Sequence, residues 1–315
     1  MAPRACTPPL LLAACLCLLT ACTPNGTAAP EPPSTSPSIL PGLRPLPDVL
    51  NGVTIDDVSA LPQLTASLKA LPQQPTARIV FDRDTPASDY ATTLAALQPI
   101  SYLMAEPVDS SEVAATSPAE YHSRTAALLA AFGTRIDIWE IGNEINGEWL
   151  GPTPDVTAKV SDAYHQVSAA GLRTAITLYY NPGCAPDTAH QMLPWARKNV
   201  PEELKRGLDY VLVSYYEDDC NHYRPPLSEW NQVFTELARL FPNARVGFGE
   251  NGTPDHNAPL ERKLEQLTHY YTLPISAPRY TGGHFWWHYA EDMLPYPPAN
   301  AMWTALAHAL TTTPP

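Results

Sequence analysis

Two carboxylates, each following a short apolar run, are the residues of this chain best suited to chemistry. Glu144 follows the run Ile136–Ile141 in the stretch IDIWEIGNEING and is preceded by Asn143. Glu250 follows the run Ala244–Phe248 and precedes an Asn and a Gly. Two carboxyl groups can divide acid and base roles when their surroundings differ. Alternatively, these residues close a strand as ordinary turn formers.

Both runs belong to an alternation of strand-like and helix-like segments. The strand-like runs are Gly52–Ile55, Ala77–Phe81, Ser101–Met104, Ile136–Ile141, Thr174–Tyr179, Tyr210–Tyr215, Ala244–Phe248 and Gly283–Trp287. Amphipathic segments lie between them, including Glu120–Phe132, Val156–Ala170, Leu227–Leu240 and Leu260–Tyr271. Eight alternating strands predict an α/β fold, a single-domain (β/α)8 TIM barrel. An open doubly wound sheet is the alternative, but its glycine-rich phosphate loop is missing.

Length and charge agree with one barrel and a neutral substrate. The chain has 315 residues, 44% of them hydrophobic, and barrels of about 250 residues are common. A net charge of −13 argues against nucleic acid as a partner, which would require clustered Lys and Arg. The Cys and His spacing matches no metal site, so we expect no metal and no cofactor.

The order of these motifs resembles the clan of retaining (β/α)8-barrel glycoside hydrolases, which includes cellulases and β-galactanases. GNEIN looks particularly like the β-galactanase branch, but that branch's long loops and calcium-binding elements are not recognisable, so the family stays open. The resemblance implies that Glu144 is the acid/base and Glu250 the nucleophile, with Asn143 bound to the sugar 2-hydroxyl. Retention would need the two carboxyl groups about 5 to 5.5 Å apart.

The resemblance also implies supporting residues, namely Arg83, Tyr215, Tyr216, Trp286 and Trp287. Arg83 is expected to bond the nucleophile, although it could equally be a surface residue paired with a neighbouring Asp. Of the two tyrosines that end the sixth strand, one is expected at the cleft and one in packing. Of the two tryptophans on the eighth strand, one should face a bound sugar and the other the helices.

Other acidic residues near strand ends are interpreted as structural or solvated residues and not as catalytic ones. Glu140 should point the same way as Glu144 by strand alternation and would need a partner inside the barrel. Glu106 and the run Glu217–Asp219 are interpreted as solvated loop charges, with Glu106 as the substitute acid if Glu144 points away. Trp149, just after the motif, either extends the cleft or packs on its own loop.

The beginning of the chain is predicted to be a processing signal. Residues 1–21 read as a signal peptide, and Leu19-Thr20-Ala21-Cys22 resembles the bacterial lipobox, which implies a lipid on Cys22. A plain secretory signal and a hydrophobic anchor helix are the alternatives. Residues 22–47 are predicted to form a Pro-rich tether, and residues 48–315 the barrel.

Cysteine usage supports export. Apart from Cys22, only Cys184 and Cys220 remain after signal removal, and they follow the fifth and sixth strands. Because these loops are neighbours in a barrel, we expect a disulfide between them, as an oxidising compartment allows. Two free thiols are the alternative.

Together these features predict an exported lipoprotein glycoside hydrolase that acts on β-linked oligo- or polysaccharides. It would lie in the outer membrane of a diderm source or otherwise at the cell surface, contacting the membrane through its lipid alone. The oligomeric state is open, with a monomer favoured. A catalytically inactive carbohydrate-binding or scaffold lipoprotein on the same barrel is the alternative, because fold does not determine function.

Overall fold

The computed structural model describes residues 43–296 and 299–312. The predicted signal segment, the lipidation site Cys22 and most of the predicted tether lie outside the described residues. Within the described ranges, every helix is too short or too polar to cross a membrane.

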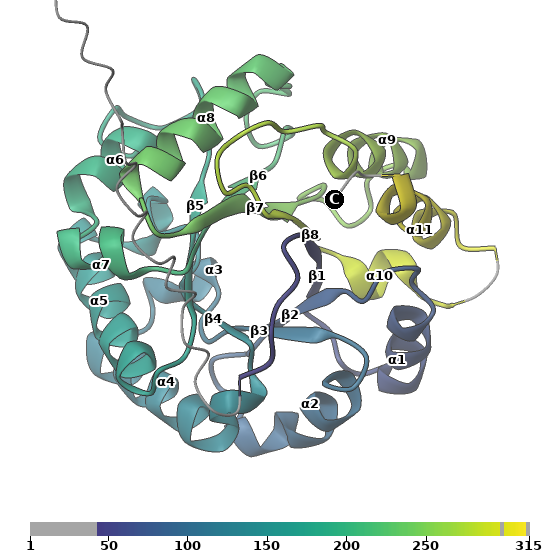
Figure 1. Cartoon of the computed structure of the whole chain (residues 1–315), viewed down its shortest axis with the longest axis horizontal. Helices are drawn as coiled ribbons and strands as arrows, with labels where there is room; N and C mark the ends of the chain where they lie inside the picture. The colour runs from purple at the N-terminus through teal and green to yellow at the C-terminus, as the bar shows by residue number, and fades with distance from the viewer. Residues whose placement is uncertain (1–42, 297–298, 313–315) are drawn as a thin grey trace, which may run out of the picture. The chain divides into compact units, whose positions relative to one another are not determined.

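Eight parallel strands close into a barrel in chain order, with β8 paired to β1. The strands are β1 (Leu50–Ile55), β2 (Thr76–Val80), β3 (Tyr102–Glu106), β4 (Ile138–Gly142), β5 (Thr174–Tyr179), β6 (Tyr210–Tyr215), β7 (Arg245–Asn251) and β8 (Gly282–Trp286). They form the centre of Figure 1, and the helices form an outer ring. The predicted TIM barrel is therefore confirmed.

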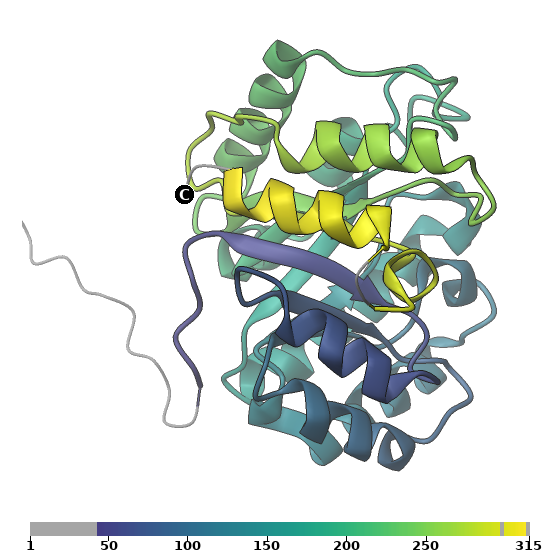
Figure 2. The ribbon, with the colours of Figure 1, turned by 90° about the vertical axis from the view of Figure 1, so that its right-hand side faces the viewer.

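The helices follow the strands along the chain. They are α1 (Leu61–Lys69), α2 (Ala91–Leu97), α3 (Ser110–Val113), α4 (Pro118–Phe132), α5 (Thr153–Ala169), α6 (Met192–Asn199), α7 (Glu202–Gly207), α8 (Leu227–Leu240), α9 (Leu260–Tyr271), α10 (Tyr289–Met293) and α11 (Ala301–Thr312). Figure 2 shows α9 and α11 side by side on the outside of the barrel, and α10 lies beside β1 in Figure 1.

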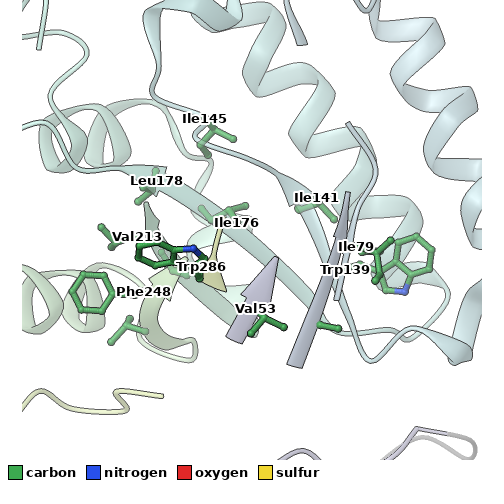
Figure 3. Close-up of a cluster of buried hydrophobic side chains, with 14 of the residues drawn as sticks. Val53, Ile79, Trp139, Ile141, Ile145, Ile176, Leu178, Val213, Phe248 and Trp286 are labelled. Atoms are coloured by element: carbon green, nitrogen blue, oxygen red, sulfur yellow. The ribbon is translucent and has the colours of Figure 1, made fainter. Parts of the chain in front are cut away.

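Two apolar layers follow from the alternation of side chains along the strands. Alternate residues such as Ile138 and Leu212 form a small cluster in the barrel interior, with Leu50, Met104, Ala175, Tyr210 and Phe285. Their strand neighbours, including Trp139 and Val213, join the larger cluster between strands and helices, part of which is shown in Figure 3. Burial of both strand faces explains why these strands read as continuous apolar runs.

The last residues of the predicted tether contact the barrel. Arg44 forms an ion pair with Asp137 and donates a hydrogen bond of 2.9 Å to the carbonyl oxygen of Gln98. Leu46 packs against the interior cluster. The last residues of the predicted tether are therefore fixed at the amino-terminal end of the barrel.

Candidate active site

A bulge in β7 turns Glu250 into the barrel. Phe248 faces the helices, with its ring 4.8 Å from that of Trp230, so strict alternation would turn Glu250 outward as well. However, Val213 of β6 pairs with Phe248, whereas Tyr215 pairs with Asn251, which leaves one extra residue on β7. A β-bulge of this kind re-aims the side chains that follow it. Glu250 is consequently buried at the end of β7, within the strand rather than after it.

A second irregularity in β4 does the same for Asn143. Glu140 and Gly142 pair with successive residues of β5, so β4 also carries an extra residue. A Cβ on Gly142 would lie 2.7 Å from Val160 Cγ2 on α5, which shows that this position faces the helix and that a side chain here would displace its neighbours. Asn143 then points inward, and Glu144 follows with a left-handed φ of 48°. Such a backbone costs energy for a residue with a side chain and is common at functional sites.

Glu250 is held by three donors. Asn143 Nδ2 donates to its Oε1 over 2.6 Å, and Tyr216 Oη donates to its Oε2 over 2.8 Å. Arg78 Nη2 lies 2.7 Å from Oε1 as an ion pair. All four side chains are buried. Donors of this kind favour an ionised carboxylate.

Arg78 is the only basic residue in a buried group of charges made by β2, β3, β4 and β7, among the described residues. Besides Glu250, it pairs with Glu106 at 2.9 Å and with Glu140 at 2.5 Å. Glu140 also accepts a hydrogen bond from Thr177 Oγ1. The three carboxylates raise the pKa of Arg78 well above its usual value despite its burial. Arg78 is thus the partner inside the barrel that a buried Glu140 was expected to need.

Glu144 is surrounded by hydroxyl groups instead of a cation. Ser110 Oγ donates to its Oε2 over 3.0 Å, and Ser214 Oγ donates to its Oε1. Burial, and then the charge of Glu250, raise the pKa of Glu144 well above its ordinary value, although the two hydroxyl groups oppose the rise. Burial without a cationic partner therefore favours the protonated form of Glu144.

The pKa of Glu250 responds to the same forces with a different balance. Burial raises it, Arg78 lowers it, and the charge of Glu140 raises it. One buried carboxyl with a cation and one without a cation can act as base and acid at the same time. The arrangement thus suits one carboxyl group to donate a proton and the other to act as a base or nucleophile.

Glu144 opens onto a cleft of about 360 Å³ at the carboxyl ends of the strands. The lining residues come from the loops after β4, β5 and β6 and include Trp149, Tyr179, Asn181, Tyr216 and Asp219. Trp149 is about one-third exposed and packs edge-on against Tyr179, 5.3 Å between ring centres. Two larger hollows, of about 600 and 1040 Å³, border Asn51 and Tyr280 and are lined by neither Glu144 nor Glu250.

Arg83 lies away from the site, contrary to the expectation, whereas Tyr215 and Trp286 are the packing members expected of the tyrosine and tryptophan pairs. Arg83 is in the loop after β2, where its guanidinium pairs with Asp84 at 3.4 Å, and Arg78 instead lies beside Glu250. Tyr215 faces the helices and donates to the carbonyl oxygen of Tyr223 over 2.5 Å. Trp286 is also buried on the helix side, with its indole NH bound to Asp292 at 2.8 Å.

Tyr216 and Trp287, which follow Tyr215 and Trp286 in the sequence, face the site. Tyr216 contacts Glu250, and the ring of Trp287 lies 5.5 Å from the guanidinium carbon of Arg78. Trp287 is partly exposed, unlike Trp286. Trp287 is therefore the tryptophan of the pair that is positioned to contact a bound ring.

Sequence reasoning missed Arg78, Ser110 and Ser214. A signal existed for Arg78, because an arginine within a strand buried on both faces must have acidic partners. The interpretation of Glu106 and Glu217 as solvated loop charges is wrong, since both side chains are buried. Glu217 pairs with Arg224 and Arg262, directly after Tyr216, and accepts a hydrogen bond from Tyr270.

The predicted disulfide is confirmed. Cys184 and Cys220 are bonded, with their Cα atoms 5.1 Å apart. The bridge joins the loops after β5 and β6, and Cys184 lines the cleft beside Glu144. It therefore ties together two of the loops that shape the cleft.

A parallel barrel with inward carboxylates at the ends of β4 and β7 is the class of architecture defined by these observations. No protein-family model matches the chain, and no curated protein matches its sequence. Solved structures do match the fold. A β-glucosidase designated 1317 superposes with a TM-score of 0.54 at 12% identity, covering 82% of this chain and 89% of that one.

Two further structures agree. A thermostable mutant of a xylanase from Cellvibrio japonicus gives a TM-score of 0.53 at 12% identity, covering 84% of this chain and 98% of that one. A glycoside hydrolase family 5 enzyme from Prevotella bryantii gives a TM-score of 0.53 at 13% identity, covering 84% and 94%. At these identities the comparison establishes the shared fold.

Proposed function

We propose that this protein is a glycoside hydrolase that cleaves β-glycosidic bonds with retention of configuration. The observation that carries the proposal is the unequal environment of two buried carboxyl groups. Glu250 is bound by Arg78, Tyr216 and Asn143, whereas Glu144 has hydroxyl partners and a pKa well above its ordinary value. The fold shared with a β-glucosidase and a xylanase supports the same reaction class.

In the proposed mechanism, the carboxylate of Glu250 attacks the anomeric carbon while Glu144 transfers its proton to the departing glycosidic oxygen. The bond to the leaving sugar breaks as an ester to Glu250 forms. The ionised Glu144 then takes a proton from water, whose oxygen displaces Glu250 at the same carbon. Two displacements restore the original configuration.

The neighbouring side chains suit this sequence of steps. Asn143 lies beside Glu250, where the 2-hydroxyl group of the attached sugar would be. Trp287 offers a partly exposed ring for stacking against the apolar face of a sugar. Tyr216 and Arg78 would hold the charge of Glu250 before attack and after release.

The substrate test is a panel of β-linked oligosaccharides, with products followed by chromatography and their initial anomeric form by NMR. We expect hydrolysis of at least one substrate, with the β-anomer formed first. The α-anomer as first product would contradict retention. Binding of oligosaccharides without any turnover would instead favour the carbohydrate-binding alternative.

We further propose that the protein is exported and carries a lipid on Cys22. The disulfide supports an oxidising compartment, and the Leu19–Cys22 motif supports lipidation. Expressed in a bacterium, the protein should incorporate labelled fatty acid and sediment with membranes, and Cys22→Ser should do neither. A wild-type protein without label would refute lipidation while leaving the glycosidase proposal untouched.

A further inference from the structure

Three metal-binding side chains converge where the barrel closes between β8 and β1. Asp56 directly follows β1, His288 precedes α10, and Glu291 lies within α10. One donor atom from each lies within 4.8 Å of the other two. The cluster therefore joins residues that follow the first and last strands of the barrel.

Two atoms of these side chains that could bind an ion are buried without a hydrogen-bond partner among the described residues. They are Asp56 Oδ1 and His288 Nε2. Leaving a buried acceptor unpaired is unfavourable, and such atoms usually have a water or an ion as partner. Asp56 and His288 are partly buried, while Glu291 is exposed and open to exchange with solvent.

The orientation of the imidazole suits metal binding. His288 also has a hydrogen bond to the backbone of Pro254. Because Nε2 is unpaired, this bond must come from Nδ1, which donates its proton to the carbonyl oxygen. The lone pair of Nε2 is thereby left free, as in histidines that bind metals.

The nearby charges do not neutralise the cluster. The ammonium group of Lys263 on α9 is bound to Asp292 and to the carbonyl oxygen of His256. The second carboxylate oxygen of Asp292 accepts the indole NH of Trp286 at 2.8 Å. Asp292 is therefore occupied in fixing α10. Asp56 and Glu291 are bound to each other through a side-chain hydrogen bond, and burial, together with Glu291, raises the pKa of Asp56 to about 7, so a cation would displace a shared proton.

We propose that Asp56, His288 and Glu291 bind one divalent transition-metal ion, best matched by Zn²⁺, with water completing the coordination. One imidazole nitrogen and two carboxylate oxygens form a donor set typical of Zn²⁺, whereas Ca²⁺ and Mg²⁺ prefer oxygen donors alone. The ion would fasten the segment after β8 to the end of β1. Trp287, adjacent to His288, would be held beside Arg78 by the same bond.

The test is calorimetric titration of chelator-treated, dialysed protein with ZnCl₂, and separately with CaCl₂ and MgCl₂. We expect one Zn²⁺ per chain, bound at least tenfold more tightly than Ca²⁺ or Mg²⁺. At a hundredfold excess over Kd, Zn²⁺ should raise Tm by about 4 °C or more. His288→Gln and Glu291→Gln should each weaken binding by at least about tenfold.

The matched control is His122→Gln, which removes an exposed histidine paired with Asp162 at 2.8 Å. It should leave the affinity unchanged. Glu291 is exposed, so Glu291→Gln tests the site even if His288→Gln fails to fold. Absence of Zn²⁺ binding below about 100 μM, or an equal loss in His122→Gln, would overturn the proposal. Binding is measured without any sugar, so this outcome is independent of the glycosidase test.

Discussion

Glu250 and Glu144 are both buried, yet the protein compensates their burial in different ways. Around Glu250, the charge of Arg78 is shared among three acids on strands of the barrel wall. Around Glu144, the partners are the hydroxyl groups of Ser110, at the start of α3, and Ser214, near the end of β6. A cation permits ionisation, whereas hydroxyl groups tolerate either protonation state.

The surroundings of Glu250 and of Glu144 also differ in the structural elements that form them. Glu250 pairs with Arg78 of β2, which also pairs with side chains of β3 and β4, and the closed barrel holds these strands in place. The cleft at Glu144 is formed by loops after β4, β5 and β6. We therefore expect changes near Glu250 to affect stability as well as activity, and changes near Glu144 to affect proton transfer and substrate binding.

The largest expected effect is on turnover. Glu250→Gln and Glu144→Gln should each reduce kcat by about a thousandfold or more, equivalent to roughly 4 kcal/mol. Azide added to Glu250→Ala should give a glycosyl azide of inverted configuration, whereas azide added to Glu144→Ala should give the retained product. Identical azide products would remove the distinction between the two carboxylates.

Removal of Arg78 should test the group of buried charges around Glu250. Arg78→Met leaves three buried acids without their cation and should lower the free energy of unfolding by about 3–5 kcal/mol, measured by urea denaturation. Without Arg78, the pKa of Glu106 and Glu250 would rise further. Raised folded-state pKa values favour the fold at low pH, so the deficit should grow as pH rises from 5 to 8.

Two variants serve as controls for this prediction. Adding Glu106→Gln to Arg78→Met should recover part of the stability, because one unpaired charge is removed. Arg83→Met, whose side chain is partly exposed, should change stability by less than about 0.5 kcal/mol. An equal effect of both arginine substitutions would contradict the assignment of Arg78.

A smaller effect on activity is expected when a hydroxyl group beside Glu144 is removed. Ser214 lowers the pKa of Glu144 by donating to its carboxylate, so Ser214→Ala should raise that pKa. The alkaline limb of the kcat/KM profile should move to higher pH, by about one unit at most. Ser111→Ala, which removes a hydroxyl bound to Asp109, is the control. A shift of the acidic limb instead would indicate that the roles are reversed.

The disulfide should have the smallest effect on the fold. A loop of 36 residues gives an upper value of about 4 kcal/mol, but the closed barrel already holds β5 and β6 together. Cys184→Ser with Cys220→Ser should therefore raise KM more clearly than it lowers Tm. Mass spectrometry after alkylation checks that the wild-type bridge is formed. Unchanged KM would show that these loops do not contact substrate.

The sequence by itself determined where the elements lie. Strands Thr174–Tyr179 and Tyr210–Tyr215 and helices Leu227–Leu240 and Leu260–Tyr271 have the bounds predicted from the pattern of apolar residues. That pattern is local, because a strand or an amphipathic helix must bury each apolar side chain whatever its distant neighbours are. Chain order and strand-end position were enough to single out Glu144 and Glu250.

Only the tertiary structure decided which side chains face the site. Arg78 rather than Arg83 reaches Glu250 because β2 directs it into the interior, toward β4 and β7. The bulges in β4 and β7 cannot be inferred from alternation, yet they turn Asn143 and Glu250 inward. The meeting of Asp56 with His288 depends in the same way on closure between β1 and β8, since contacts between distant segments are created by barrel closure and leave no local pattern.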